Sequence, residues 1–104
     1  MFGWGTKTIS TGELAEKLAS GKRVLIDVRE PYEFAQGRIP GAVNIPLGQL
    51  ADASTSLDPT AETYLICASG SRSGVAARQL KKLGFTDAYS VAGGMHAWHG
   101  KVKR

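Results

Sequence analysis

Apolar residues along this chain follow two spacings, one typical of buried strands and the other of helices. Unbroken β-branched or aliphatic runs at 23–28 (RVLIDV) and 63–67 (TYLIC) predict strands that are buried on both faces. Shorter runs at 7–10 and 87–91 predict two more strands, and a brief strand is expected between the turn residues of 38–46. The chain therefore offers five strand segments.

Helical spacing of apolar residues appears between the strand segments. Ser10 followed by Glu13 forms a capping-box pattern at the start of one helix, and Gly21 ends that helix. A longer helix is expected to begin at about Ser73 or Gly74. The pattern predicts further short helices over 30–37, 47–52 and 93–100.

Strands that alternate with helices predict an α/β fold, in which helices cover both faces of a mostly parallel sheet. The length of 104 residues, with 42% hydrophobic and 21% charged residues, suits one globular domain. We therefore expect a single domain over residues 1–104, with its core at about 6–99 and a basic tail at 100–104.

The composition argues against several classes of protein. A single cysteine, Cys67, rules out an intrachain disulfide, and no group of Cys and His residues has zinc-finger spacing. His96 and His99 have no carboxylate or thiol close by in the sequence, so a metal site is not expected. The chain shows no signal-peptide pattern, and no apolar run approaches the roughly 20 residues that a membrane-spanning helix needs. We expect a cytoplasmic protein with a reduced thiol and without a cofactor.

Charge is distributed unevenly along the chain. Residues 1–66 carry 6 Lys and Arg against 8 Asp and Glu, whereas residues 67–104 carry 7 against 1. The basic excess would attract an anionic substrate or an acidic partner, or it reflects a solvated helix face at Arg78, Lys81 and Lys82 together with a frayed tail. For the tail, we favour the second explanation, a frayed and solvated end. No basic stripe interleaved with aromatic residues is present, so nucleic-acid binding is not expected.

Cys67 lies where a predicted strand gives way to the loop ASGSRS and then to a helix. Ligands of parallel sheets collect at the carboxyl ends of strands, and a loop of small residues before a helix can point backbone N–H groups at an anion. In that field and beside Arg72, the pKa of the thiol would fall into the range of about 3.5–7.5 found for reactive cysteines. The hydroxyls of Ser69, Ser71 and Ser73 could add hydrogen bonds. A buried structural cysteine is the alternative, which this sequence context disfavours.

The spacing of Cys67 and Arg72 separates two chemistries. Cysteine phosphatases use C-x5-R, a ring wide enough for a phosphoryl group, whereas four residues intervene here. The shorter ring better suits a smaller group, such as a terminal sulfur on Cys67. Thiol–disulfide exchange would need a second cysteine to resolve a mixed disulfide, and the chain has none.

Three blocks of the sequence resemble the rhodanese family of sulfurtransferases. CASGSRS (67–73) resembles its active-site loop C-x-x-G-x-R, LIDVREPYEFAQGRIPGAVNIPL (25–47) its upstream signature, and GGMHAW (93–98) its closing Gly-Gly-x-x-x-Trp. The blocks occur in family order and span most of the chain. The resemblance implies a parallel five-stranded sheet flanked by helices on both faces. It also implies ping-pong sulfur transfer from a donor such as thiosulfate, through a Cys67 persulfide, to cyanide or a thiol.

The resemblance implies roles for individual residues. Arg72 would steer and hold the anionic donor, because its guanidinium stays charged. Asp27, Arg29 and Glu33 are interpreted as groups that order neighbouring loops rather than as catalytic groups. Arg38 stands where the family usually has His, which replaces a titratable group by a permanent cation. The loop amides expected to cradle the persulfide belong to Ala68, Ser69, Gly70, Ser71, Arg72 and Ser73.

The sequence leaves three functions open. The leading prediction is a thiosulfate-type sulfurtransferase that acts on a small anionic donor and a thiophilic acceptor. The second is a persulfide carrier or docking module that exchanges sulfur with another protein. The third, a cysteine phosphatase or arsenate reductase of related fold, is disfavoured by the short loop. No membrane or nucleic-acid partner is expected, and we expect a monomer or a weak homodimer.

Overall fold

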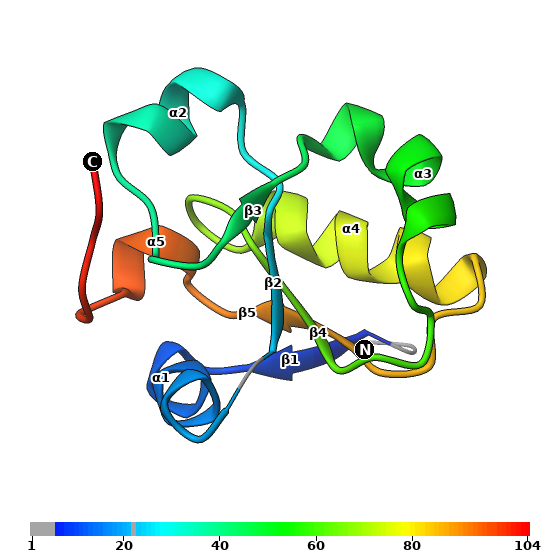
Figure 1. The fold of residues 1–104 in the computed structure, drawn as a ribbon, viewed down its shortest axis with the longest axis horizontal. Helices are drawn as coiled ribbons and strands as arrows, with labels where there is room; N and C mark the ends of the chain where they lie inside the picture. The colour runs from blue at the N-terminus through cyan, green and yellow to red at the C-terminus, as the bar shows by residue number, and fades with distance from the viewer. Residues whose placement is uncertain (1–5, 22) are drawn as a thin grey trace.

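A sheet of five parallel strands forms the centre of the molecule (Figure 1). The computed structural model describes residues 6–21 and 23–104. The spatial order of the strands is β1-β5-β4-β2-β3, which confirms the predicted parallel five-stranded sheet. The strands are β1 (Lys7–Ile9), β2 (Val24–Asp27), β3 (Val43–Asn44), β4 (Thr63–Ile66) and β5 (Ala88–Val91).

The helices alternate with the strands in sequence, as the pattern predicts, and the last helix follows the last strand. Ser10 caps the first helix: its Oγ accepts from the Glu13 amide at 3.0 Å, and Glu13 Oε1 accepts from the Ser10 amide at 3.0 Å. Pro31 begins the second helix, where a missing N–H costs nothing. The helices are α1 (Thr11–Ala19), α2 (Pro31–Gln36), α3 (Leu50–Ala53), α4 (Ser71–Lys82) and α5 (Gly94–Ala97), with 3₁₀ turns η1 (Leu47–Gln49) and η2 (Ser54–Ser56).

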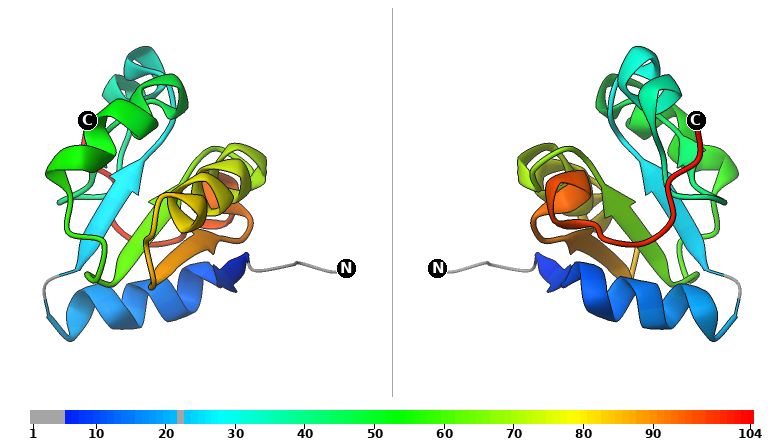
Figure 2. Two further views of the ribbon diagram at one scale, coloured as in Figure 1. Left: turned by 90° about the vertical axis from the view of Figure 1, so that its right-hand side faces the viewer. Right: turned by 90° about the vertical axis from the view of Figure 1, so that its left-hand side faces the viewer.

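Two apolar clusters occupy the two faces of the sheet. Successive strand residues point to opposite faces, so Leu65 joins one cluster and Tyr64 the other. The first cluster includes Leu80 of α4, and the second includes Leu14 of α1. Figure 2 shows α1 on one side of the sheet and α4 on the other. Every residue of β4 is buried, because β4 is the central strand and is covered on both faces.

The basic tail pairs with another segment, so the expectation that it is frayed is wrong. Lys103 and Arg38 exchange backbone hydrogen bonds of 2.8 and 2.9 Å in a short antiparallel bridge. Trp98 Nε1 also donates to the Lys101 carbonyl at 2.9 Å. The bridge between Arg38 and Lys103 joins segments far apart in the sequence, which local composition does not reveal. Within the described residues, no helix combines the length and the apolar character needed to cross a bilayer.

The first turn of α5 holds the end of β4. The amides of Met95 and His96 donate to the carbonyls of Cys67 and Ala68 at 2.8 and 2.9 Å. Gly94 stands at this contact with a φ of +54°, a conformation that L side chains rarely adopt. A Cβ at Gly94 would overlap the two carbonyl oxygens. Glycine is therefore required for α5 to approach the strand end.

We predict that Gly94→Ala lowers the free energy of unfolding by about 1–3 kcal/mol, because the added methyl group strains the backbone of this contact. Gly74→Ala is the matched control. Gly74 lies inside α4 with open space around it, and alanine there should raise stability by about 0.5–1 kcal/mol. Urea unfolding of both variants measures the difference in the free energy of unfolding. A Gly94→Ala protein as stable as the parent would show that this position does not require glycine.

Candidate active site

Cys67 directly follows the central strand. The strand ends at Ile66, one residue earlier than expected, so Cys67 is the first residue beyond it at the carboxyl edge of the sheet. Its side chain is 0% exposed and lies in the apolar cluster beneath α4. The sulfur is thus held inside the protein at the edge where parallel sheets bind ligands.

The loop after Cys67 turns its backbone amides onto the sulfur. The amides of Gly70 and Ser73 donate to Cys67 Sγ at 3.0 and 3.3 Å. Gly70 caps α4 with a φ of +109°, which glycine adopts without strain. The helix begins at Ser71, earlier than the predicted start at Ser73 or Gly74. The first-turn amides, which have no partner inside the helix, are therefore free to face the sulfur.

Two buried hydroxyls continue this hydrogen-bond network. Ser73 Oγ lies 3.5 Å from Cys67 Sγ and 2.8 Å from Ser90 Oγ, and both serines are buried. Sequence reasoning missed Ser90, although a polar residue within a buried strand was a signal that could have revealed it. Ser69 and Ser71 are exposed, with their hydroxyls 3.5 Å apart. Of the three loop hydroxyls considered from the sequence, that of Ser73 lies beside the sulfur.

These contacts favour the ionised form of the thiol. Burial raises the pKa of Cys67, but hydrogen bonds outweigh it and the pKa falls below its ordinary value. They come from the hydroxyl and amide of Ser73 and from the amides of Gly70 and Ser69. The positive end of the α4 dipole acts in the same direction. The site therefore stabilises the thiolate more than water does for a free cysteine, and the thiolate is the form in which cysteine is a nucleophile.

Arg72 projects from the first turn of α4 to Glu33 of α2. Its Nη1 and Nη2 donate to Glu33 Oε1 and Oε2 at 2.8 and 3.0 Å. Glu33 Oε1 also accepts from the Glu30 amide at 2.9 Å. The guanidinium lowers the pKa of Glu33 to about 2. The predicted donor-holding arginine is thus already bound by a carboxylate.

Asp27 and Arg29 form a buried ion pair at the end of β2. Arg29 Nη2 donates to Asp27 Oδ2 at 2.7 Å and to the Gly37 carbonyl, also at 2.7 Å. Asn44 Nδ2 donates to the carbonyls of Asp27 and Arg29, both at 2.9 Å. These bonds tie β2 to the segment after α2 and to β3. Asp27 and Arg29 therefore hold the loops around the site together.

Arg38 contacts α2 and the C-terminal segment. Its guanidinium lies over the ring of Phe34, 5.0 Å from the ring centre, and its backbone pairs with Lys103. The side chain is half-buried in this position. The arginine that replaces the family's usual histidine is thus engaged by α2 and the C-terminal segment.

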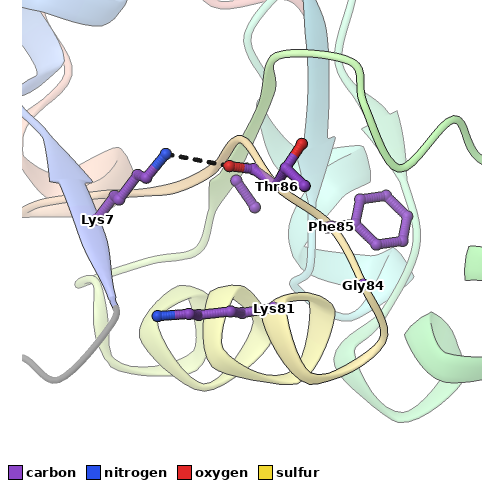
Figure 3. A pocket seen from close by; sticks show the side chains of 6 residues that line it. Lys7, Lys81, Gly84, Phe85 and Thr86 are labelled. Atoms are coloured by element: carbon purple, nitrogen blue, oxygen red, sulfur yellow. Dashed lines mark hydrogen bonds between the residues drawn. The ribbon is translucent and has the colours of Figure 1, made fainter.

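A surface hollow of about 380 Å³ lies near the amino ends of β1 and β5, away from the carboxyl ends of the strands where Cys67 lies (Figure 3). Lys7 begins β1 and Ala88 begins β5, whereas Cys67 follows the end of β4. The hollow has two lysines in its lining, and Lys7 donates to the Thr86 carbonyl at 3.1 Å. Its lining consists of Lys7, Lys81, Gly84, Phe85, Thr86 and Ala88. The lining offers no nucleophilic thiol, so the candidate active site is the cysteine loop.

Comparison with known proteins gives consistent matches. The Rhodanese-like domain family matches residues 10–101. Two relatives from Bacillus subtilis are YqhL, 48% identical over 79% of this chain, and YrkF, named as a candidate sulfur carrier protein and 41% identical over 91%. This chain spans 65% of YqhL and 52% of YrkF. The human thiosulfate:glutathione sulfurtransferase is 35% identical, with 90% of this chain and 94% of that protein covered.

Solved structures agree with these matches. A rhodanese-like domain protein from Staphylococcus aureus superposes with a TM-score of 0.86 at 39% identity, covering 94% of this chain and 97% of that chain. The fold, the family match and the relatives all indicate the same family. The chain belongs to the rhodanese-like domain family, whose members compared here include sulfurtransferases.

Proposed function

We propose that this protein is a sulfurtransferase that moves a sulfane sulfur from a donor such as thiosulfate to a thiophilic acceptor through a persulfide on Cys67. The observation that carries the proposal is the pair of amide hydrogen bonds from Gly70 and Ser73 to Cys67 Sγ. The similarity to the human thiosulfate:glutathione sulfurtransferase supports it.

The proposed reaction has two steps. The Cys67 thiolate attacks the outer sulfur of thiosulfate, the Sγ–S bond forms, and sulfite leaves with the electron pair of the broken S–S bond. Cyanide or an acceptor thiolate then attacks the transferred sulfur, which regenerates the Cys67 thiolate and gives thiocyanate or a new persulfide. This is double-displacement catalysis with a covalent intermediate. The loop amides stabilise the negative charge on sulfur in both steps.

The structure of the loop supports sulfur over phosphate as the transferred group. Four residues separate Cys67 from Arg72, and the Cys67 thiol is fully buried. A persulfide extends the side chain by one S–S bond of about 2 Å, whereas a phosphoryl group would need room for three oxygen atoms. A cytoplasmic location, a monomeric or weakly dimeric state and independence from a cofactor stay predictions.

A surface feature favours a second function, persulfide exchange with a protein partner. Arg78, Lys81 and Lys82 lie on α4, downstream of the cysteine loop. Among the described residues, no carboxylate lies within ion-pair distance of these three side chains. A basic helix face attracts an acidic protein surface. The similarity to YrkF supports this alternative.

The protein should form thiocyanate from thiosulfate and cyanide, and Cys67→Ser should abolish the reaction because the nucleophile is lost. Intact mass spectrometry after treatment with thiosulfate alone should show the gain of one sulfur atom in the parent protein and none in the variant. A parent protein that produces no thiocyanate and gains no sulfur would refute the proposed function.

The rate of persulfide formation should rise with pH through the pKa of Cys67 and level off above it, because the thiolate is the attacking form. Since hydrogen bonds lower that pKa, the midpoint should lie below that of an unperturbed cysteine measured under the same conditions. Ser73→Ala removes the neighbouring hydroxyl and should move the midpoint upward. Ser56→Ala changes an exposed hydroxyl and should leave it in place. Equal midpoints in all three proteins would contradict this account.

Reversing charge at Lys81 and Lys82 tests the second function. The double change to Glu should slow loading by a persulfide-bearing protein, such as a cysteine desulfurase, and leave the rate with thiosulfate within about twofold. The same change at Lys101 and Arg104, both exposed, alters net charge equally and serves as the control. If both double variants load from the protein donor as fast as the parent, the α4 face is not a docking surface.

A further inference from the structure

The arginine of the cysteine loop is paired with a neighbouring carboxylate. Arg72 lies in the first turn of α4, and its charge interacts with that of Cys67. Both of its terminal nitrogens bind the carboxylate of Glu33, at 2.8 and 3.0 Å. Two parallel N–H···O bonds are the strongest arrangement for such a pair. The guanidinium therefore presents little net positive charge to a ligand in the loop.

Glu33 is held in position and does not depend on Arg72 alone. Its Oε1 accepts from the Glu30 amide at 2.9 Å in the capping box of α2. The carbonyl of Gly37, which follows α2, accepts from buried Arg29 at 2.7 Å. α2 is thus anchored at both ends. The bond from the Glu30 amide therefore holds the Glu33 carboxylate in place beside Arg72.

The other arginines of the neighbouring segment are also engaged. Arg29 is buried against Asp27 at 2.7 Å, and Arg38 lies over the Phe34 ring. At the loop itself, the amides of Gly70 and Ser73 face the sulfur, and such backbone amides suit one negatively charged sulfur. A second negative charge on the donor would meet a guanidinium that Glu33 already occupies.

We propose that Glu33 sets the charge of the sulfur donor, so that the site selects monoanionic sulfane donors over dianionic thiosulfate. This inference rests on the proposed sulfur transfer and names its substrate class. Methanethiosulfonate is such a donor, with a methyl group in place of one charged oxygen of thiosulfate. The Cys67 thiolate attacks its outer sulfur, the Sγ–S bond forms, the S–S bond breaks, and methanesulfinate leaves with the electron pair.

Glu33→Gln tests the proposal, because glutamine keeps the size and the helix-capping ability of Glu33 but removes its charge. The second-order rate of sulfur gain, followed by intact mass with each donor alone, is compared with the parent. The rate with thiosulfate should rise about tenfold and the rate with methanethiosulfonate only about threefold, because the freed guanidinium acts on two donor charges in the first case and on one in the second.

Two further variants separate local pairing from net charge. Glu30→Gln removes an exposed carboxylate three residues away and should leave the ratio of the two rates unchanged. In an Arg72→Gln background, Glu33→Gln should no longer change the ratio, because the cation it acts on is absent. An equal change with both donors in Glu33→Gln, whether gain or loss, would overturn the proposal. Failure of the parent to gain sulfur from either donor would instead refute the proposed function.

Discussion

The hydrogen bonds to Cys67 Sγ depend on one junction in the chain, at which the central strand β4 ends and the helix α4 begins. β4 is buried along its whole length, so the residue after it emerges under α4 rather than in solvent. Gly70 then turns the chain with a positive φ, and α4 starts at once. Because the helix starts so early, the amide of Ser73 still belongs to the first turn and is free to bind the sulfur. A buried thiol thereby becomes a stabilised anion site.

Segments from much of the chain support this junction. The amides of α5 bind the carbonyls of Cys67 and Ala68, and Ser90 of β5 contacts the Ser73 hydroxyl. In addition, Glu33 of α2 accepts a hydrogen bond from Arg72 in the first turn of α4. A buried polar network of this kind stabilises one arrangement only when its members are satisfied together. The environment of the sulfur is thus a property of the assembled fold and not of the loop alone.

The sequence predictions are accurate where a feature depends on residues close together in the chain, and they fail where it depends on residues far apart. Strands, helix caps and the loop itself come from neighbouring residues, and their patterns predicted them within a few positions. The start of α4 was placed too late because its apolar spacing marks the buried face and not the first turn. The pairing of Arg72 with Glu33 and of Lys103 with Arg38 joins distant segments. Charge and composition suggest a free cation at Arg72 and a frayed tail at Lys103, because neither reveals which partner the fold supplies.

The pairing of Arg72 with Glu33 changes how the basic half of the chain acts. Arg78, Lys81 and Lys82 remain without ion-pair partners among the described residues, so their field extends into solvent over about a Debye length, roughly 8 Å at physiological salt. Arg72, in contrast, is compensated within 3.0 Å. In our proposals, attraction of an anion or an acidic surface therefore belongs to the far part of α4, whereas discrimination between donors belongs to its first turn. Because attraction and discrimination belong to different parts of α4, a basic protein can attract anions while its nucleophile does not react preferentially with the most highly charged donor.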